Sequence, residues 1–451
     1  MERFDIVVIG AGAAGEAAAQ LARRREASVA VVERELFGGS CAYWACMPSK
    51  ALLHAAAMHH LGSDEYPWRR ASEFRDWMIN REHIDWPDDS SHVKSLEDAG
   101  ATAIRGTARF SAPGQLEVET DGGSRTLAAG AVIVAVGSHS KIPDLPGLRE
   151  AGHWTNREGT ATRELPQSIA ILGGGPTGVE LAQVYARYDV PTTLVDSNPR
   201  INSRDHPRSS EFLAKSLSSD GVKIRTGIRA QRVHPRDGAD GAHRVELSDG
   251  SSVEGHALLV AIGRELPLEG LNLSAIGVTP TDGRVDVDDQ LRIAEGVWTA
   301  GDVAGPELHT HLAHYQGEMA VRLALGDDVR PDFTAIPRAT YTDPECASVG
   351  LRVDEAKERG IDAVEISLDL ATTAKGYVAE AEGHVTIVVD RAERVLVGAF
   401  IAGPAASETI HEAVLAVKTR TPISVLADTL HAFPTVARVL VTAFIQADQE
   451  L

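Results

Sequence analysis

The first apolar stretch of the chain, residues 4–9, is short and rich in β-branched side chains. A run of this kind is typical of a strand that is buried on both faces of a parallel sheet. An alanine-rich segment follows and predicts a helix to about Arg25, and a second run over residues 28–32 predicts a strand that ends at Glu33. The order of strand, helix and strand predicts a βαβ unit.

The same pattern recurs farther along the chain. Residues 168–172 form an apolar run, a helical segment continues to about Asp189, and residues 192–195 predict a strand that ends at Asp196. In both copies a G-x-G-x-x-G turn joins the first strand to the helix, and the acidic residue lies 18 positions after the last glycine. Two such units predict two nucleotides held by two domains.

The pattern changes after Pro331. Residues 385–389 and 395–400 are apolar runs joined by a charged turn, which predicts an antiparallel hairpin, and residues 408–418 predict a helix. We therefore expect an α/β protein with two Rossmann-like dinucleotide-binding domains and a third, C-terminal α+β domain. Residues 64–91, with three tryptophans among many charges, predict a helix-and-loop excursion without an assigned role.

Composition and charge limit the kinds of molecule that the protein is expected to bind. The chain has 451 residues and a formal net charge of −20, which repels nucleic-acid phosphates and disfavours anionic membrane surfaces. No apolar run is long enough to span a bilayer, and the chain enters a strand pattern directly after its first residues, without a signal peptide. We expect a cytoplasmic protein that acts on a small molecule.

Each glycine-rich turn would let the backbone approach a pyrophosphate at a helix N-terminus. Glu33 and Asp196 would each accept hydrogen bonds from a ribose 2′-hydroxyl. A carboxylate at Asp196 repels a 2′-phosphate, so we expect NADH to be preferred over NADPH. Arg200 and Arg204 follow shortly and would favour the phosphate instead.

The three cysteines are too few for a disulfide-stapled secreted fold, and two of them, Cys41 and Cys46, lie close together. Residues five apart in a regular helix are about 8 Å apart, beyond disulfide reach, so a bridge needs a local departure from helix. No further ligands cluster nearby, and we expect no metal. Cys346 lies in a strand pattern and is expected to pack in the core.

The segment Gly38-Gly39-Ser40-Cys41-Ala42-Tyr43-Trp44-Ala45-Cys46-Met47-Pro48-Ser49-Lys50 resembles the redox motif of the class I pyridine nucleotide-disulfide oxidoreductases, the family of lipoamide dehydrogenase, glutathione reductase and mercuric reductase. Further matches run along almost the whole chain, at residues 134–138, 261–264, 299–302, 342–345 and 403–408. The resemblance implies an FAD-binding domain at residues 1–144 and 265–330, an NAD(P)-binding domain at 145–264, and a C-terminal α+β interface and dimerisation domain at 331–451. It also implies FAD, NADH or NADPH as cofactors, and a homodimer in which one subunit completes the other's active site.

The resemblance also implies residue roles. Cys46 would be the thiol beside the flavin and Cys41 the interchange thiol, while Lys50 would pair with Glu180 next to the flavin. These four residues are the expected catalytic set. The expected cofactor-binding residues are Gly10, Gly12, Gly15, Glu33, Gly39, Lys50, Gly137, Asp302, Gly173, Gly175, Gly178, Asp196, Gly263 and Arg264.

The resemblance breaks at one place. Disulfide reductases of this family carry a His-Pro-Thr motif near the C-terminus, with a glutamate a few residues on, and here Phe433 and Arg438 occupy the histidine and glutamate positions. A positioned base contributes about 10²–10⁴-fold to rate, so exchange with dihydrolipoamide or glutathione disulfide is expected to be poor unless His431 substitutes. The C-terminal cysteine pair of mercuric reductases is also missing.

Three functions remain open on the sequence. The first is reduction of a small-molecule disulfide or another acceptor through Cys41 and Cys46. The second is NAD(P)H-dependent reduction of a quinone, metal ion or other small oxidant without thiol exchange. The third, which the intact cysteine pair and Lys50 disfavour, is a flavoprotein with a binding role.

Overall fold

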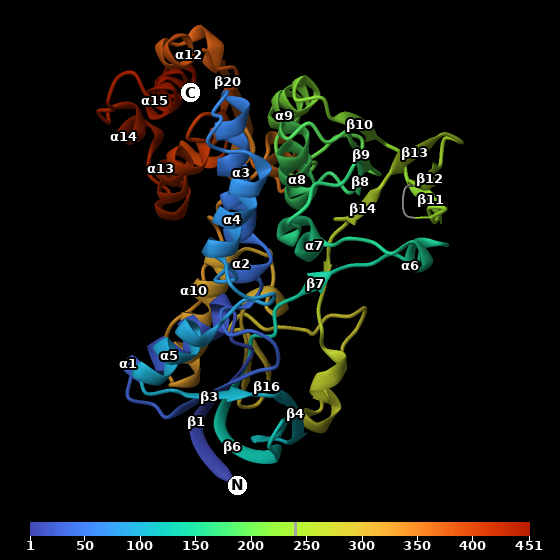
Figure 1. The fold of residues 1–451 in the computed structure, drawn as a ribbon. Helices are drawn as coiled ribbons and strands as arrows, with labels where there is room; N and C mark the ends of the chain where they lie inside the picture. Colours follow the sequence, from blue (N-terminus) through green and yellow to red (C-terminus); the bar gives the residue numbers. More distant parts are fainter. Residues whose placement is uncertain (239–240) are drawn as a thin grey trace. The chain divides into compact units, whose positions relative to one another are not determined.

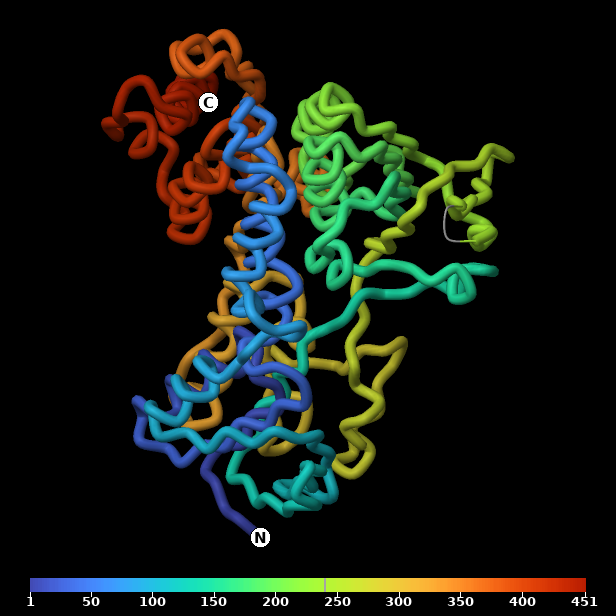
Figure 2. Tube along the Cα trace, in the orientation of Figure 1, coloured from blue at the N-terminus to red at the C-terminus, as the bar shows by residue number. Residues whose placement is uncertain are grey.

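The computed structural model describes residues 1–238 and 241–451 (Figure 1). The chain divides into two compact units. The first contains residues 1–48, 73–141 and 263–332, and the second contains residues 49–72, 142–262 and 333–451. Both units are therefore assembled from segments far apart in the sequence, as the colours of the tube in Figure 2 show.

The first unit is built on a mostly parallel sheet with the order β16-β17-β6-β1-β2-β3, extended by an antiparallel pair, β4 and β5. Its strands are β1 (Glu2–Ile9), β2 (Val29–Glu33), β3 (Thr102–Arg105), β4 (Thr107–Ala112), β5 (Gln115–Thr120), β6 (Gly123–Val134), β16 (Arg292–Ala294) and β17 (Val297–Thr299). In the parallel pairing of β1 with β2, Ile6 lies opposite Val29. The apolar run of residues 4–9 is thus a central strand, and its buried end confirms the predicted burial.

Two helices of the first unit, α1 (Ala13–Arg24) and α10 (Thr310–Ala324), pack closely because small residues meet between them. A Cβ on Gly317 would lie 2.2 Å from the carbonyl oxygen of Ala14, so only glycine permits this approach. The small alanine side chains of α1, which predicted a helix, thus also allow α10 to pack closely against it. The unit also holds α2 (Gly39–Tyr43), α5 (Ser90–Asp98), β7 (His139–Ser140), β15 (Arg264–Glu265), η1 (Glu269–Leu271), η2 (Leu273–Ile276) and η3 (Gly301–Val303).

The second unit contains a parallel sheet of order β10-β9-β8-β14 and an antiparallel sheet of order β11-β12-β13. The strands are β8 (Ile169–Leu172), β9 (Thr192–Asp196), β10 (Lys223–Thr226), β11 (Ala230–His234), β12 (His243–Leu247), β13 (Ser252–Gly255) and β14 (Ala257–Val260). The helices here are α6 (Leu148–Ala151), α7 (Asn156–Ala161), α8 (Pro176–Arg187) and α9 (Pro207–Ser219). The second predicted βαβ unit is confirmed by β8, α8 and β9, since β8 and β9 pair in parallel.

The C-terminal part of the second unit is an antiparallel sheet of order β18-β19-β22-β21-β20. Its elements are β18 (Arg338–Thr340), β19 (Glu345–Gly350), α11 (Val353–Glu358), β20 (Ala363–Asp369), η4 (Leu370–Thr372), α12 (Ala374–Ala379), β21 (His384–Asp390), β22 (Val395–Gly403), α13 (Ala406–Thr419), α14 (Ile423–Ala427) and α15 (Val436–Glu450). The predicted hairpin is confirmed by the antiparallel pairing of β21 with β22. Helices α13 and α15 share one hydrophobic core with this sheet.

The tryptophan-rich excursion contains α4 (Trp68–Met78) and then an irregular loop that leads to α5, which confirms the predicted mixture of helix and loop. Helix α3 (Cys46–His60) precedes it. Among the described residues, no helix is both long and apolar enough to cross a membrane.

Candidate active site

The predicted redox pair lies on two helices that are separated by a break. Cys41 belongs to the short helix α2, and Cys46 is the first residue of α3. Trp44 and Ala45 leave the helical path between them. The chain therefore departs from a regular helix between the two cysteines, as a bridge between thiols five residues apart requires.

The redox segment begins directly on the first glycine-rich turn. The backbone N–H of Gly38 donates to the carbonyl oxygen of Ala11 at 2.8 Å. Gly39 has a left-handed φ of +67°, and a Cβ there would lie 2.6 Å from the Cα of Gly12. Gly38 has a left-handed φ of +102°, so both glycines adopt backbone conformations that seat the redox segment against the turn.

Thr310 was not singled out by the sequence, yet it contacts the redox pair. Its hydroxyl lies 3.3 Å from the Sγ of Cys46, and it is the first residue of α10. The sulfur thus faces a hydroxyl at the start of a helix, where the backbone dipole favours negative charge. In the sequence, Thr310 is marked only by its position at the start of an amphipathic helix pattern. No spacing in the sequence connects it with Cys46.

Lys50 and Glu180 form the expected ion pair. The Nζ of Lys50, on α3, lies 2.8 Å from a carboxylate oxygen of Glu180, on α8, and the glutamate side chain is only 5% exposed. The carboxylate also accepts a hydrogen bond of 3.0 Å from the backbone N–H of Tyr341, and the Nζ of Lys50 lies 4.6 Å from the centre of the Tyr341 ring. The pair is thus held in place by the C-terminal part of the chain.

The first glycine-rich turn joins β1 to α1. A Cβ on Gly10 would lie 2.3 Å from the carbonyl oxygen of Ala135, and one on Gly15 would lie 1.9 Å from the carbonyl oxygen of Gly10. These two glycines are required by the protein itself. Gly12, the N-cap of α1, has an ordinary φ of −78°. An added Cβ there would have the Cα of Gly39 as its nearest neighbour, at 3.8 Å. The missing side chain therefore leaves room for a ligand at the helix N-terminus.

Glu33 ends β2 and faces the same turn. One carboxylate oxygen accepts the backbone N–H of Ala11 at 2.9 Å, and the other accepts that of Glu35 at 2.7 Å. Burial raises the pKa of Glu33, and these two hydrogen bonds oppose that rise. The carboxylate is therefore fixed at the edge of the turn, where a ribose would lie.

The two crossing segments found by resemblance lie side by side. Strands β7 and β15 pair in antiparallel fashion, and the N–H of Lys141 donates to the carbonyl of Gly263 at 2.9 Å. Gly137 and Gly263 have left-handed φ values of +64° and +136°. Both glycines therefore allow the chain to turn where it leaves a sheet.

Asp302 lies in η3, directly after β17. It accepts the hydroxyl of Ser138, and the guanidinium of Arg264 lies 3.6 Å from its carboxylate. Gln316, fully buried on α10, accepts the backbone N–H of Gly301 at 3.0 Å and so holds the turn that carries Asp302. Sequence reasoning missed Gln316, because a buried glutamine on a helix has no distinctive spacing.

The second glycine-rich turn joins β8 to α8 and repeats this construction. A Cβ on Gly173 would lie 2.3 Å from the carbonyl oxygen of Ala261, and one on Gly178 would lie 1.9 Å from that of Gly173. At Gly175, the N-cap of α8, φ is −78° and no atom lies within 4 Å of an added Cβ. Since nothing in the protein itself requires a glycine there, the open space fits a pyrophosphate at the helix N-terminus.

Asp196 ends β9 and is buried against this second turn. One carboxylate oxygen accepts the backbone N–H of Gly174 at 2.5 Å, and the other accepts the N–H and the side-chain amide of Asn198. The guanidinium of Arg200 is already engaged within the protein, since it donates to the hydroxyl of Ser210 at 2.7 Å. Burial also lowers the pKa of Arg200.

The segment near the C-terminus that departs from the family's His-Pro-Thr motif is well defined in the structure. Phe433 lies in the loop between α14 and α15 and is 73% exposed. His431, two residues earlier, is turned inward: its side chain is 8% exposed, and its Nε2 lies 2.8 Å from the carboxylate of Glu412 on α13. Arg438 lies in the first turn of α15, where its backbone N–H donates to Thr435.

Other predicted features have structural places. Cys346 is fully buried in β19, and burial raises the pKa of its thiol well above its usual value, which confirms a packing role. The segments 342–345 and 403–408, found by resemblance, meet where a carboxylate oxygen of Glu345 accepts the backbone N–H and hydroxyl of Ser407 at 2.9 and 2.8 Å. Among the described residues, no group of three or more His, Cys, Asp or Glu is placed to hold a metal ion.

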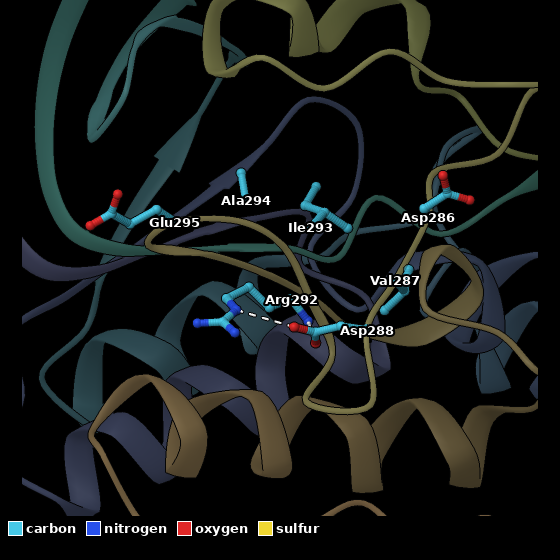
Figure 3. A pocket seen from close by; sticks show the side chains of 7 residues that line it. All are labelled: Asp286, Val287, Asp288, Arg292, Ile293, Ala294 and Glu295. Atoms are coloured by element: carbon cyan, nitrogen blue, oxygen red, sulfur yellow. Dashed lines mark hydrogen bonds and ion pairs between the residues drawn. The ribbon is translucent and has the colours of Figure 1, made fainter.

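A shallow surface hollow of about 450 Å³ lies at the outer strand β16 of the first unit (Figure 3). It is lined by Asp286, Val287, Asp288, Arg292, Ile293, Ala294 and Glu295. Asp288 and Arg292 are already paired with each other there. The hollow contains none of the predicted site residues.

The site thus combines two helix N-termini that have space for pyrophosphates, each beside a carboxylate at the end of a strand. A cysteine pair lies against one of these two turns. Together these features define a dinucleotide-dependent α/β oxidoreductase. Residues 4–317 match the family described as pyridine nucleotide-disulphide oxidoreductase, and residues 336–444 match its dimerisation domain. The chain belongs to this family. Its members use FAD and NAD(P)H.

Several relatives match over nearly their whole length. The chain is 31% identical to a dihydrolipoyl dehydrogenase of Thermus scotoductus, with 98% of this chain and 97% of that protein covered. It is 32% identical to a mercuric reductase of Streptomyces lividans, with 97% and 94% covered. The fold resembles that of LpdA from Mycobacterium tuberculosis, at 27% identity, a TM-score of 0.86 and 99% coverage of both chains.

Proposed function

We propose that this chain is an FAD-dependent NAD(P)H oxidoreductase that passes electrons through a Cys41–Cys46 disulfide to a small acceptor. The observation that carries the proposal is the seat of the redox segment. Gly38 and Gly39 are packed on the turn at Gly12, which is also the turn with open space at a helix N-terminus. Because the redox segment packs on the turn that would bind the FAD pyrophosphate, we expect the two cysteines to lie near the flavin of the same FAD.

The two units divide the binding roles in this proposal. The first unit would hold FAD through the turn of residues 10–15, Glu33 and Asp302, and the parallel sheet of the second unit would hold NAD(P)H through the turn of residues 173–178 and Asp196. The sheet and helices of residues 331–451 would form the dimer interface. When bound, FAD would supply the centre that accepts hydride from NAD(P)H and reduces the disulfide.

The residues of this chain would then stabilise the charges that develop during the reaction and hold the reacting groups in place. The ammonium of Lys50, oriented by Glu180, would stabilise negative charge that develops on the reduced cofactor. The hydroxyl of Thr310 and the start of α10 would stabilise the thiolate of Cys46. The Cys41 thiolate would carry the exchange with the acceptor.

Anaerobic titration with NADH tests the disulfide. We expect a two-electron-reduced state with long-wavelength absorbance from a thiolate next to the flavin, and Cys46→Ser should abolish it. Cys346→Ser is the matched control, because Cys346 is buried in β19 and should leave the band unchanged. Direct bleaching of the flavin without that band in the native protein would reject a working disulfide.

A second candidate function, reduction of an apolar quinone-like acceptor, is favoured by Phe433. A phenyl ring cannot accept a proton, and at 73% exposure it offers an apolar surface where the family usually has an imidazole. We therefore propose that dihydrolipoamide and glutathione disulfide are poor substrates. Phe433→His combined with Arg438→Glu should raise disulfide exchange more than quinone reduction, and equal changes in both would contradict this assignment.

A further inference from the structure

His431 makes hydrogen bonds through both of its ring nitrogens. Its Nε2 lies 2.8 Å from each carboxylate oxygen of Glu412, and its Nδ1 lies 2.9 Å from the carbonyl oxygen of Thr429. The partners of both ring nitrogens are oxygen atoms of the protein itself. With both nitrogens engaged in this way, the ring has no free nitrogen with which to take a proton from a substrate.

Burial reinforces this geometry. The His431 side chain is 8% exposed and that of Glu412 is 25% exposed, so the pair is largely shielded from water. A shielded, charge-assisted hydrogen bond is stronger than an exposed one, and removal of either partner leaves the other uncompensated. The pair therefore joins the loop after α14 firmly to helix α13.

The loop is also anchored on its other side. The hydroxyl of Thr435 donates to the carbonyl of Ala432 at 2.7 Å and accepts the backbone N–H of Arg438 at 3.1 Å, which caps α15. Phe433 lies between this anchor and His431, with its side chain exposed. The loop is thus held at both ends while its apolar tip faces outward.

We infer that His431 and Glu412 are positioning residues: they hold the loop so that Phe433, and not a base, faces the acceptor. This inference rests on the proposed function and deepens it. The acceptor that fits is an apolar, planar oxidant such as a quinone. NADH would be oxidised to NAD⁺, its hydride would supply two electrons and one proton, and water would supply the second proton that completes the hydroquinone. This step needs no base at the interchange thiol. His431 acts through Phe433 and does not touch the acceptor.

Two substitutions at one position separate positioning from catalysis. His431→Gln keeps a donor toward Glu412 but has no imidazole, whereas His431→Ala removes both. We expect His431→Ala to raise the KM for a water-soluble benzoquinone about 5–10-fold with kcat within twofold of native. His431→Gln should restore most of that KM, and neither variant should change the pH profile of quinone reduction.

A matched control and a double variant sharpen the test. His234 pairs with Glu246 at 2.8 Å on an exposed hairpin, so His234→Ala removes a similar pair and should leave the KM unchanged. Glu412→Gln together with His431→Ala should be no worse than His431→Ala alone, because both changes break one interaction.

The possible failures are distinct. If His431→Gln and His431→Ala both lower kcat at least 100-fold and lose the acidic limb of the pH profile, His431 is the base and the inference is wrong. If His431→Ala leaves the KM unchanged, the pair does not position the acceptor surface. If native protein is not reduced by NADH at all, the proposed function fails first, independently of either result.

Discussion

At the scale of single residues, the site depends on side chains that no motif identifies. Thr310 touches Cys46, Gln316 holds the turn of Asp302, and Tyr341 supports the Lys50–Glu180 pair. Thr310 and Tyr341 lie more than 150 residues away from the side chains they support, and Gln316 lies 15 residues from the Gly301 N–H that it binds. The chemistry-bearing cysteines, lysine and glutamate were predictable by resemblance, whereas their supports depend on how distant segments fold together.

Thr310 gives a prediction that isolates one hydroxyl. Thr310→Val keeps the shape of the side chain and removes the donor, so the Cys46 thiolate loses a hydrogen bond worth about 1.5–3 kcal/mol to a charged group. We expect the thiol pKa of Cys46, measured by alkylation rate against pH in a Cys41→Ser background, to rise by about one unit or more. Thr310→Ser should behave like the parent, and an unshifted Thr310→Val profile would exclude the hydroxyl from thiolate stabilisation.

At the scale of elements, strand and helix positions follow closely from the hydrophobic pattern. Predicted strands at residues 28–32 and 192–195 appear as β2 and β9, which end at the acidic residues expected there. The pattern succeeded because parallel strands buried on both faces are nearly continuous apolar runs. It could not predict that Asp196 would bind the backbone of its own turn, since that contact depends on the fold of residues 173–178.

The nucleotide preference belongs to this scale, because it depends on the turn after β8 and the end of β9. Asp196 is fixed beside the turn and repels a 2′-phosphate, while Arg200 is bonded to Ser210. We expect kcat/KM for NADH to exceed that for NADPH at least tenfold, and Arg200→Ala to preserve this order. A preference for NADPH that disappears in Arg204→Ala would transfer the deciding role to that arginine.

At the scale of the whole molecule, the chain forms two units from interleaved segments, which sequence patterns alone did not delimit. Residues 49–72 pack within the second unit, although in the sequence they lie between two segments of the first. Tyr188 and Leu52 share a small apolar cluster there. Such packing reflects contacts between residues far apart in sequence, and local periodicity does not encode them.

Oligomeric state is predicted at this scale. Residues 336–444 match a dimerisation domain, and exposed apolar side chains lie on its helices, among them Leu415 and Val425. We expect a homodimer by light scattering at micromolar concentration, about twice the 48.0 kDa of one chain. A monomer under those conditions would contradict both the dimer and the proposed role of Phe433.

Stability against pH follows from a buried histidine. His384, on β21, is fully buried between Ser209 and Thr386, and burial, with His206 and Arg208 nearby, lowers its pKa to about 3. Between pH about 6.5 and 3 the unfolded chain binds a proton at this site and the folded chain does not, so stability falls as pH falls.

The slope is about 1.4 kcal/mol per pH unit in that window. The slope is half of this value at pH 6.5, where the unfolded histidine is half protonated, so between pH 6.5 and 5 we expect the parent to lose about 1.6 kcal/mol more stability than His384→Gln. Thermal unfolding midpoints of the two proteins at both pH values provide the measurement. The buried Asp205, whose pKa is raised by burial, opposes this trend equally in both proteins, and parallel pH dependences would exclude His384 as the source.

The place of β17 governs the order in which the chain can complete its structure during synthesis. Residues 132–134 of β6 have β17 as their neighbour, and β17 is made only at residues 297–299. At about 5–20 residues per second, the ribosome takes roughly 8–33 s to cover that interval. The second parallel sheet, with all its strands between residues 169 and 260, is complete before then. The sheet that is translated first therefore gains its last parallel strand only after the second parallel sheet is complete. A ribosome that pauses within residues 142–262 leaves an apolar strand edge exposed to chaperones or to other nascent chains.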